Sequence, residues 1–147
     1  MKRFTSTIAA CVIATTAQAE NITVKSAVSV DQAVGRLTQA VEDAGARVFT
    51  TVNFAQGSTS VGNALRPTQV VIFGSPKIGA DALLEGQTMG LFLPLRVLAY
   101  QDAMGETWLM YPDPEDAAIE HGIPADHPAV QKMKSVLAKM TKLASAG

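Results

Sequence analysis

Cysteine is almost absent from this sequence, because Cys11 is the only one among its 147 residues. It lies within residues 1–19, a segment that we expect to be removed after Ala19 as a secretory leader. The mature chain would then carry no thiol. This excludes a disulfide, a thiolate nucleophile and a cysteine-ligated zinc ion.

The N-terminal segment has the three parts of a secretory leader. Lys2 and Arg3 form its basic region, residues 8–14 form a short apolar run, and Ala-Gln-Ala at 17–19 forms the cleavage site. We therefore expect the protein in the periplasm or outside the cell. Lipidation of Cys11 is the alternative, since Ile-Ala-Ala-Cys fits a loose lipoprotein pattern, but the segment before it is too short for both a basic and an apolar region.

Excess positive charge and long apolar runs are also missing. The sequence has 12 basic and 13 acidic residues, and the leader removes two of the basic ones. A mildly acidic chain without a basic cluster argues against nucleic acid as a partner. No segment approaches the roughly 20 apolar residues that a membrane-spanning helix needs, so we expect no membrane association after cleavage.

Five segments alternate apolar and polar residues or are rich in β-branched residues, which predicts strands. They are residues 22–29, 47–54, 70–73, 95–100 and 107–111. The segment 70–73 is apolar on both faces, so we expect it inside the sheet or covered on each side. Asp102 and Gly105 suit a tight reversal between the last two strands, which predicts an antiparallel hairpin.

Two amphipathic helices stand out. The first begins at Ser29, whose hydroxyl forms a capping box with Gln32, and ends before Gly45, which suits a left-handed C-terminal position. The second covers the C-terminal segment, with apolar residues from Val130 to Ala144 on one stripe and lysines elsewhere. We interpret it as a helix laid on the sheet; a dimer seam and a membrane-surface helix are the alternatives. A short helix is expected near 61–65.

These elements predict an α+β fold, namely a two-layer sandwich with a mainly antiparallel sheet and helices packed on one face. Residues 20–147 have the length of one domain.

The segment around Gly74 and Gly79 is the closest approach to a known phosphate-binding motif. A P-loop requires Lys and Ser or Thr after its second glycine, whereas Ala80 and Asp81 stand there. Pro76 likewise blocks a dinucleotide loop. Ser75 as a helix N-cap followed by Pro76 explains the sequence as a structural joint. Lys77 leaves open the binding of a small anion at this helix start.

Histidine and carboxylates suggest a second kind of site. His121 and His127 follow three acidic residues, which are Glu115, Asp116 and Glu120. This is the chemistry of a metal site, but the six-residue spacing of the two histidines, with Pro124 and Pro128 breaking the path, favours solvated loop histidines. The segment 57–62, Gly-Ser-Thr-Ser-Val-Gly, lacks the register of a nucleophile elbow.

Two arginines and two tyrosines complete the candidates. Arg66 and Arg96 lie near strand ends, where either could clamp a carboxylate or close a surface ion pair. Tyr100 and Tyr111 lie on the expected hairpin, where we expect buried rings.

An ordered set of motifs resembles the DUF302 family of uncharacterised bacterial and archaeal domains. The motifs are Phe-Gly-x-Pro-Lys from residue 73, Leu-Pro-Leu-Arg-Val-Leu from residue 93 and Gly-x-x-Trp-x-x-Tyr from residue 105. The resemblance covers roughly residues 25 to 143. It implies a small α+β domain with an antiparallel sheet, often a homodimer, and no established activity.

The sequence departs from this family at one position. Many members carry Asp-His at the end of the second strand, where this chain has Asn53 and Phe54. Phenylalanine cannot exchange a proton or bind a metal, which weakens a site of that kind here.

Our interpretation is a non-enzymatic module that binds a small anionic molecule or a protein, without a cofactor, and pairs as a homodimer. The candidate ligand-binding residues are Asn53, Arg66, Ser75, Lys77 and Arg96. The alternative is a metal-assisted hydrolase that uses His121, His127 and the nearby carboxylates.

Overall fold

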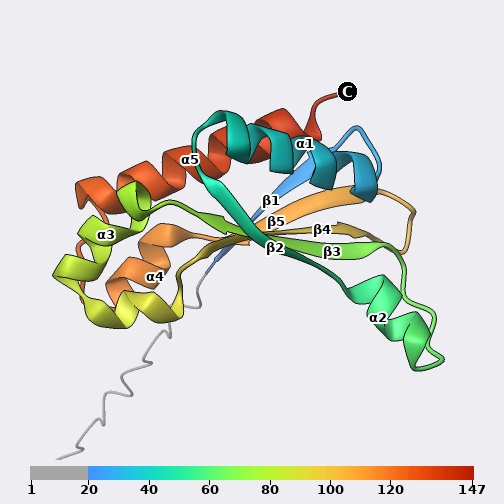
Figure 1. Ribbon diagram of the computed structural model, residues 1–147, viewed down its shortest axis with the longest axis horizontal. Coiled ribbons are helices and arrows are strands. Elements are labelled where there is room, and N and C mark those ends of the chain that lie inside the picture. Colours follow the sequence, from blue (N-terminus) through green and yellow to red (C-terminus); the bar gives the residue numbers. More distant parts are fainter. Residues whose placement is uncertain (1–19) are drawn as a thin grey trace, which may run out of the picture.

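The computed structural model describes residues 20–147, so the expected leader and Cys11 lie outside the described residues. Figure 1 shows an arched sheet with helices above it. The strands are β1 (Asn21–Ser26), β2 (Arg47–Asn53), β3 (Thr68–Gly74), β4 (Leu95–Gln101) and β5 (Thr107–Pro112). The helices are α1 (Val30–Asp43), α2 (Phe54–Ser60), α3 (Pro76–Glu85), the 3-10 helix η1 (Gln87–Leu91), α4 (Pro114–Glu120) and α5 (Pro128–Ser145).

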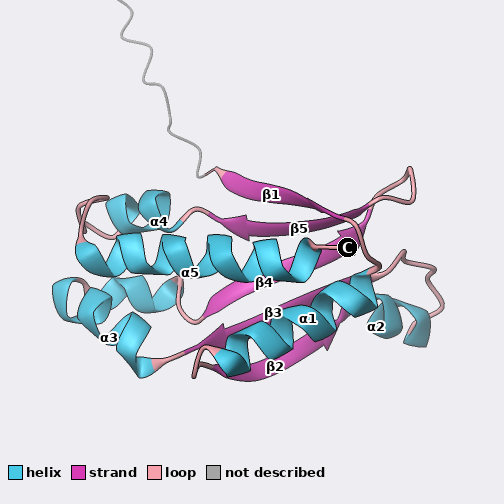
Figure 2. Cartoon of the chain, turned by 90° about the horizontal axis from the view of Figure 1, so that it is seen from above, coloured by secondary structure: helices cyan, strands magenta, loops and turns pink. Residues whose placement is uncertain are grey.

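The five strands form one antiparallel sheet in the order β1-β5-β4-β3-β2. The two long helices, α1 and α5, lie side by side across one face of this sheet (Figure 2). The predicted two-layer α+β sandwich and the β4–β5 hairpin are therefore confirmed.

The core lies between the sheet and these two helices. On β3, Val71 and Phe73 are fully buried toward α1 and α5, while Val70 and Ile72 alternate onto the opposite face and are only half-buried. Residues 70–73 thus belong to a strand inside the sheet, between β2 and β4, as one of the two expectations had it. The second face of this strand is not covered by α1 and α5. Leu37 of α1 is among the buried side chains that this arrangement requires.

Local capping explains where the helices begin. Ser29 accepts from the backbone N–H of Gln32 and the Gln32 side chain reaches back, as the capping box predicts. Gly45 has φ of 72°, the left-handed value that favours glycine at a helix end. Ser75 accepts from the N–H of Lys77, and Pro76 opens α3. The segment after β3 is therefore a strand-to-helix joint, as the sequence predicts.

Short helices differ from the expectation. The prediction of a helix near 61–65 is wrong. The helix lies at Phe54–Ser60, and a turn at Val61 and Gly62 follows it. The reason is Asn53, whose side chain accepts from the N–H of Gln56 and starts the helix directly at the strand end. Likewise α4 and η1 were not predicted from the sequence.

The turn between β4 and β5 is closed by one side chain. Asp102 Oδ1 accepts from the backbone N–H groups of Met104 and Glu106 at 2.8 and 2.9 Å, and Oδ2 accepts from Trp108 Nε1 at 2.8 Å. Gly105 supplies the positive φ of 81°. These contacts hold the carboxylate in its charged form, and the pKa of Asp102 is lowered, chiefly by the bond from Trp108.

The outer strand β2 is irregular. A β-bulge shifts its register against β3 between Val48 and Thr50, and the intervening Phe49 is about half exposed. A ring carbon of Phe49 lies 3.2 Å from the position that a side chain at Gly74 would occupy. Glycine at this point therefore lets the ring cover the end of β3.

Candidate functional site

The candidate ligand-binding residues fall in three separate places. Asn53 caps α2, as described above. Arg66 Nε donates to the carbonyl of Gln101 at 3.1 Å, beside the β4–β5 turn. Arg96 Nη1 donates to the carbonyl of Phe92 at 3.2 Å, and its guanidinium lies 5.7 Å from the centre of the Phe92 ring. These three residues therefore do not converge with Ser75 and Lys77 on a single ligand.

Ser75 and Lys77 line a cavity at the joint between β3 and α3. The cavity has a volume of about 250 Å³ and lies under α5, beside the end of α1. Lys132 of α5 also reaches it, and its Nζ donates to the Lys77 carbonyl at 3.0 Å. The rest of the wall is formed by Val41, Ala44, Gly45, Ala46, Phe73, Ile78, Val136 and Met140. The cavity is thus mainly apolar, with Lys77 and Lys132 among its lining residues.

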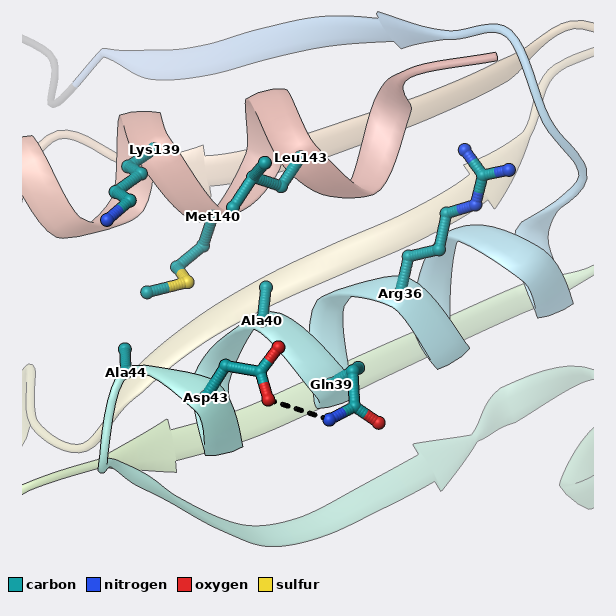
Figure 3. A pocket seen from close by; sticks show the side chains of 8 residues that line it. All are labelled: Arg36, Gln39, Ala40, Asp43, Ala44, Lys139, Met140 and Leu143. Carbon is teal, nitrogen blue, oxygen red and sulfur yellow. Dashed lines mark hydrogen bonds between the residues drawn. The ribbon is translucent and has the colours of Figure 1, made fainter.

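A second hollow continues along the seam between α1 and α5 (Figure 3). Its volume is about 330 Å³, and it is lined by Arg36, Gln39, Ala40, Asp43, Ala44, Lys139, Met140 and Leu143. Ala44 and Met140 line both hollows, so the two adjoin. In Figure 3 the Met140 side chain points from α5 into the space above Ala40 and Ala44.

The face of the sheet opposite α1 and α5 forms a third surface, which we call the open face. Val52, Val70, Leu98 and Met110 lie opposite one another across four neighbouring strands. A hollow of about 480 Å³ on this face is lined by Asn21, Phe54, Val70, Ile72, Arg96, Leu98, Met110, Tyr111 and Pro112. The open face is therefore largely apolar and accessible.

Helix α2 borders the open face. In Figure 1 it projects below the sheet, at the end away from α3 and α4. None of its residues is buried, and Phe54 at its start is 45% exposed. Phe54 thus belongs to the open face, where its ring adds to the accessible apolar surface.

The two histidines serve as helix ends. His121 follows α4 at its C-cap, whereas His127 caps α5 by accepting from the N–H of Ala129 through Nδ1 at 3.3 Å. His127 Nε2 lies 3.8 Å from Glu85 Oε1. Within residues 20–147 no three His, Asp or Glu side chains are grouped as metal ligands.

The neighbouring carboxylates are engaged in contacts between elements. Glu115 pairs with Lys134 of α5 at 2.8 Å and accepts from Gln131 at 2.8 Å. The bond from Lys134 lowers the pKa of Glu115, and the same contact raises the pKa of Lys134. Asp116 accepts from the backbone N–H of Glu20 at 2.6 Å. These residues join α4 to α5 and to the start of β1.

The remaining candidates have structural surroundings. In the segment 57–62, the Ser60 hydroxyl donates to the Gly57 carbonyl at 2.7 Å, within α2. Tyr111 is buried against the helices, and burial raises the pKa of its hydroxyl. Tyr100 is only half-buried, on the open face beside Arg66, so the expectation of a buried ring holds for one tyrosine of the two.

Sequence reasoning missed three residues of the seam, which are Ala44, Lys132 and Met140. Their spacing along α1 and α5 predicts amphipathic helices but does not say which helices lie side by side. Lys132 could be recognised only as a lysine beside the apolar stripe of α5, a position that cations often occupy on any surface helix.

The architecture defines a small α+β domain with two helices packed on an antiparallel sheet. Residues 22–144 match the family described as "Domain of unknown function DUF302", and the chain belongs to this family. A solved structure described as the uncharacterised conserved protein DUF302 from Bacillus stearothermophilus has the same fold, with a TM-score of 0.76 at 21% identity over 84% of this chain and 97% of that one.

Curated relatives carry a different kind of name. The "Fluoride-specific ion channel FluC 1" of Brucella suis biovar 1 (strain 1330) is 35% identical over 126 residues, which cover 84% of this chain and 49% of the relative. The "Fluoride-specific ion channel FluC 2" of Brucella melitensis biotype 1 matches equally over 46% of its length. This chain therefore spans about half the length of these relatives. Among the helices of residues 20–147, none has the length and apolar character that crossing a membrane requires.

Proposed function

We propose that the mature protein is a secreted or periplasmic, non-enzymatic binding module that uses its open face to pair with a second copy of the chain. The observation that carries this proposal is the apolar row across the open face, together with α2 beside it. A sheet usually buries its apolar face against another layer. Here α1 and α5 supply that layer on one side only.

Helix α2 supports the same proposal. It has only seven residues and buries none of them. Isolated helices of this length are marginal in water, and helices in proteins gain most of their stability from packing an apolar side. Phe54 exposes its ring at the base of α2, and Leu65 is 45% exposed just beyond it. A second copy laid against the open face would cover these side chains.

The charges along the open face permit self-association. Lys25 pairs with Glu106 at 2.5 Å, and Asp102 is held by Trp108 and the turn. Arg96 lies against Phe92 toward one end of β4. The central row of Val70, Leu98 and Met110, where two copies would meet, is itself uncharged, and Arg66 and Arg96 line the hollows beside it. Two sheets packed face to face in this way form a sandwich interface.

The curated relatives are consistent with a binding role. They carry a segment like this chain within a protein about twice as long. When two segments belong to one chain, each is held at a high effective concentration near the other. A contact between them then forms more readily than the same contact between two separate chains. We propose such a docking role for the segment and transfer no ion transport to this chain.

The test uses Phe54→Glu. Glutamate in the first turn favours α2 itself, so the helix is kept while the apolar ring is removed. We expect sedimentation velocity over a range of concentrations to show a dimer for the wild type and a predominant monomer for the variant. Leu84→Glu is the matched control, because Leu84 is 84% exposed on α3, away from the open face.

Two outcomes would contradict the proposal. One is a wild-type protein that sediments as a monomer at every concentration. The other is a dimer that Phe54→Glu leaves intact while Leu84→Glu dissociates it, because the contact would then lie on the α3 side of the molecule.

A further inference from the structure

The two adjoining hollows between α1, α5 and α3 are independent of the open face. We call them together the α1–α5 groove. It lies on the opposite side of the sheet, within the helix layer (Figures 2 and 3). Its two parts have volumes of about 250 and 330 Å³ and share Ala44 and Met140. Sites for small molecules usually have a combined volume of this order, with apolar walls and a few polar groups that fix orientation.

The walls and the rim of the groove differ in character. Its floor is apolar, with Val41, Met140 and Phe73 buried beneath it. Its charged lining consists of four cationic residues and one acidic residue, which are Arg36, Lys77, Lys132, Lys139 and Asp43. The whole sequence has a net charge of −1, so this local excess of positive charge runs against the composition.

Three of the charged residues that line the groove already have hydrogen-bond partners. These partners indicate at which end of the groove a charged ligand group would lie. Arg36 donates to the carbonyl of Ala146 near the C-terminus, and Asp43 accepts from Gln39 at 2.8 Å. Lys132 Nζ bonds to the backbone carbonyl of Lys77, which places the Lys132 ammonium group at the α3 end, where Lys77 also lines the groove. An ammonium group has three donors, so Lys132 retains donors for a ligand.

We propose that the α1–α5 groove binds a single-chain amphiphile with an anionic head, of the fatty-acid class. The carboxylate lies between Lys77 and Lys132, and the acyl chain extends over Val136 and Met140 toward Ala40 and Leu143. This goes beyond pairing through the open face, because it assigns a ligand to a separate site.

Met140 sets the length of chain that the groove accepts. Met140 lines both hollows and is 2% exposed. Methionine is unbranched and flexible, so it can change rotamer and open the junction without moving the helices. A short carboxylate such as acetate makes the ionic contact only, whereas decanoate also displaces water from the apolar floor.

Isothermal titration calorimetry on the processed protein tests the proposal with four probes. These are decanoate below its micellar concentration, decylammonium, acetate, and vesicles that contain an anionic phospholipid. We expect decanoate to bind one to one, decylammonium to bind at least about 10-fold more weakly, and acetate to give no measurable heat. Vesicles should compete for decanoate without binding the protein.

Three variants locate the site. Ala44 is exposed and lines both hollows, so Ala44→Leu should obstruct the junction without disturbing the core and weaken decanoate binding roughly 10-fold. The double change Lys77→Glu and Lys132→Glu should reverse the preference from decanoate to decylammonium. Lys142→Glu is the matched control, because Lys142 is an exposed lysine on α5 outside the groove, and it should bind as the wild type does. Circular dichroism confirms that each variant is folded.

A reversed preference with an unchanged control supports the proposal, because loss of structure cannot exchange one head group for the other. Equal binding of decanoate and decylammonium to the wild type would overturn it, as would unchanged binding by Ala44→Leu. Binding of the protein to vesicles but not to monomeric decanoate would also overturn it, since it would make α5 a membrane-surface helix.

Discussion

At the scale of single residues, Asp102 shows how one side chain organises a whole turn. Its carboxylate accepts from two backbone N–H groups and from the indole of Trp108. The sequence predicts a reversal here from Asp102 and Gly105, but it does not show that Trp108 closes the third bond. That contact depends on the register of β4 against β5, which brings residues six positions apart to the same end of the hairpin.

The first prediction concerns the pH dependence of this turn. The pKa of Asp102 is lowered in the folded state, so its stabilising effect is fully present above its unfolded value near 3.8 and is lost as the pH falls below that value. We expect Asp102→Asn to reduce the free energy of unfolding at pH 7 and to differ less from the wild type near pH 3.

Urea unfolding monitored by the fluorescence of Trp108, the only tryptophan, measures the free energy of unfolding of each protein at pH 7 and near pH 3. Asp81→Asn is the control, because Asp81 lies on α3 away from the turn. A difference between wild type and Asp102→Asn that is constant over this pH range would show that the charge of Asp102 does not stabilise the turn.

The second prediction concerns the core beneath the helices. Phe73 is fully buried between the sheet and the helix layer, whereas Leu84 is 84% exposed. Phe73→Ala should lower the free energy of unfolding by about 3–5 kcal/mol, because it removes apolar contacts and leaves a cavity. Leu84→Ala should change it by less than about 0.5 kcal/mol. Chemical unfolding of both variants makes the comparison, and equal effects would contradict the assignment of the core.

At the scale of elements, the sequence predicted those helix starts and turns that are stabilised by contacts between residues close together in the chain. The capping box of α1, the Ser75-Pro76 start of α3 and the hairpin reversal were readable, because their partners lie within a few residues. Helix α2 was misplaced because it begins at Phe54, directly after its N-cap Asn53, whereas the β-branched and aromatic composition of residues 47–54 assigns Phe54 to the strand. Of the groove, the sequence indicated Ser75 and Lys77. It could not indicate Lys132, because only the packing of α5 beside α1 brings that residue to the joint.

The third prediction tests the capping of α1. Replacing Ser29 with alanine removes the side-chain acceptor for the Gln32 N–H and should cost about 1 kcal/mol of stability. Ser60→Ala is the control, because Ser60 lies at the end of the exposed helix α2 and bonds only within it. Equal losses in urea unfolding would mean that the Ser29 cap adds nothing specific.

At the scale of the whole molecule, the removal of residues 1–19 can be tested directly. The fourth prediction is that the full sequence, expressed with a functioning export system, yields a periplasmic or secreted protein that begins at Glu20. Intact mass spectrometry should show the loss of residues 1–19. A mass that retains a lipid on Cys11 would instead support the lipoprotein alternative, and an unprocessed cytosolic chain would contradict export.

The irregular border formed by β2 has a consequence for how copies of this protein can meet. A strand with a bulge and a protruding phenylalanine ring offers a poor template for hydrogen bonding by another chain. Growth into a continuous ribbon of many molecules is therefore discouraged along this side. Because pairing through the open face would cover that face in both molecules, such an assembly would stop at two.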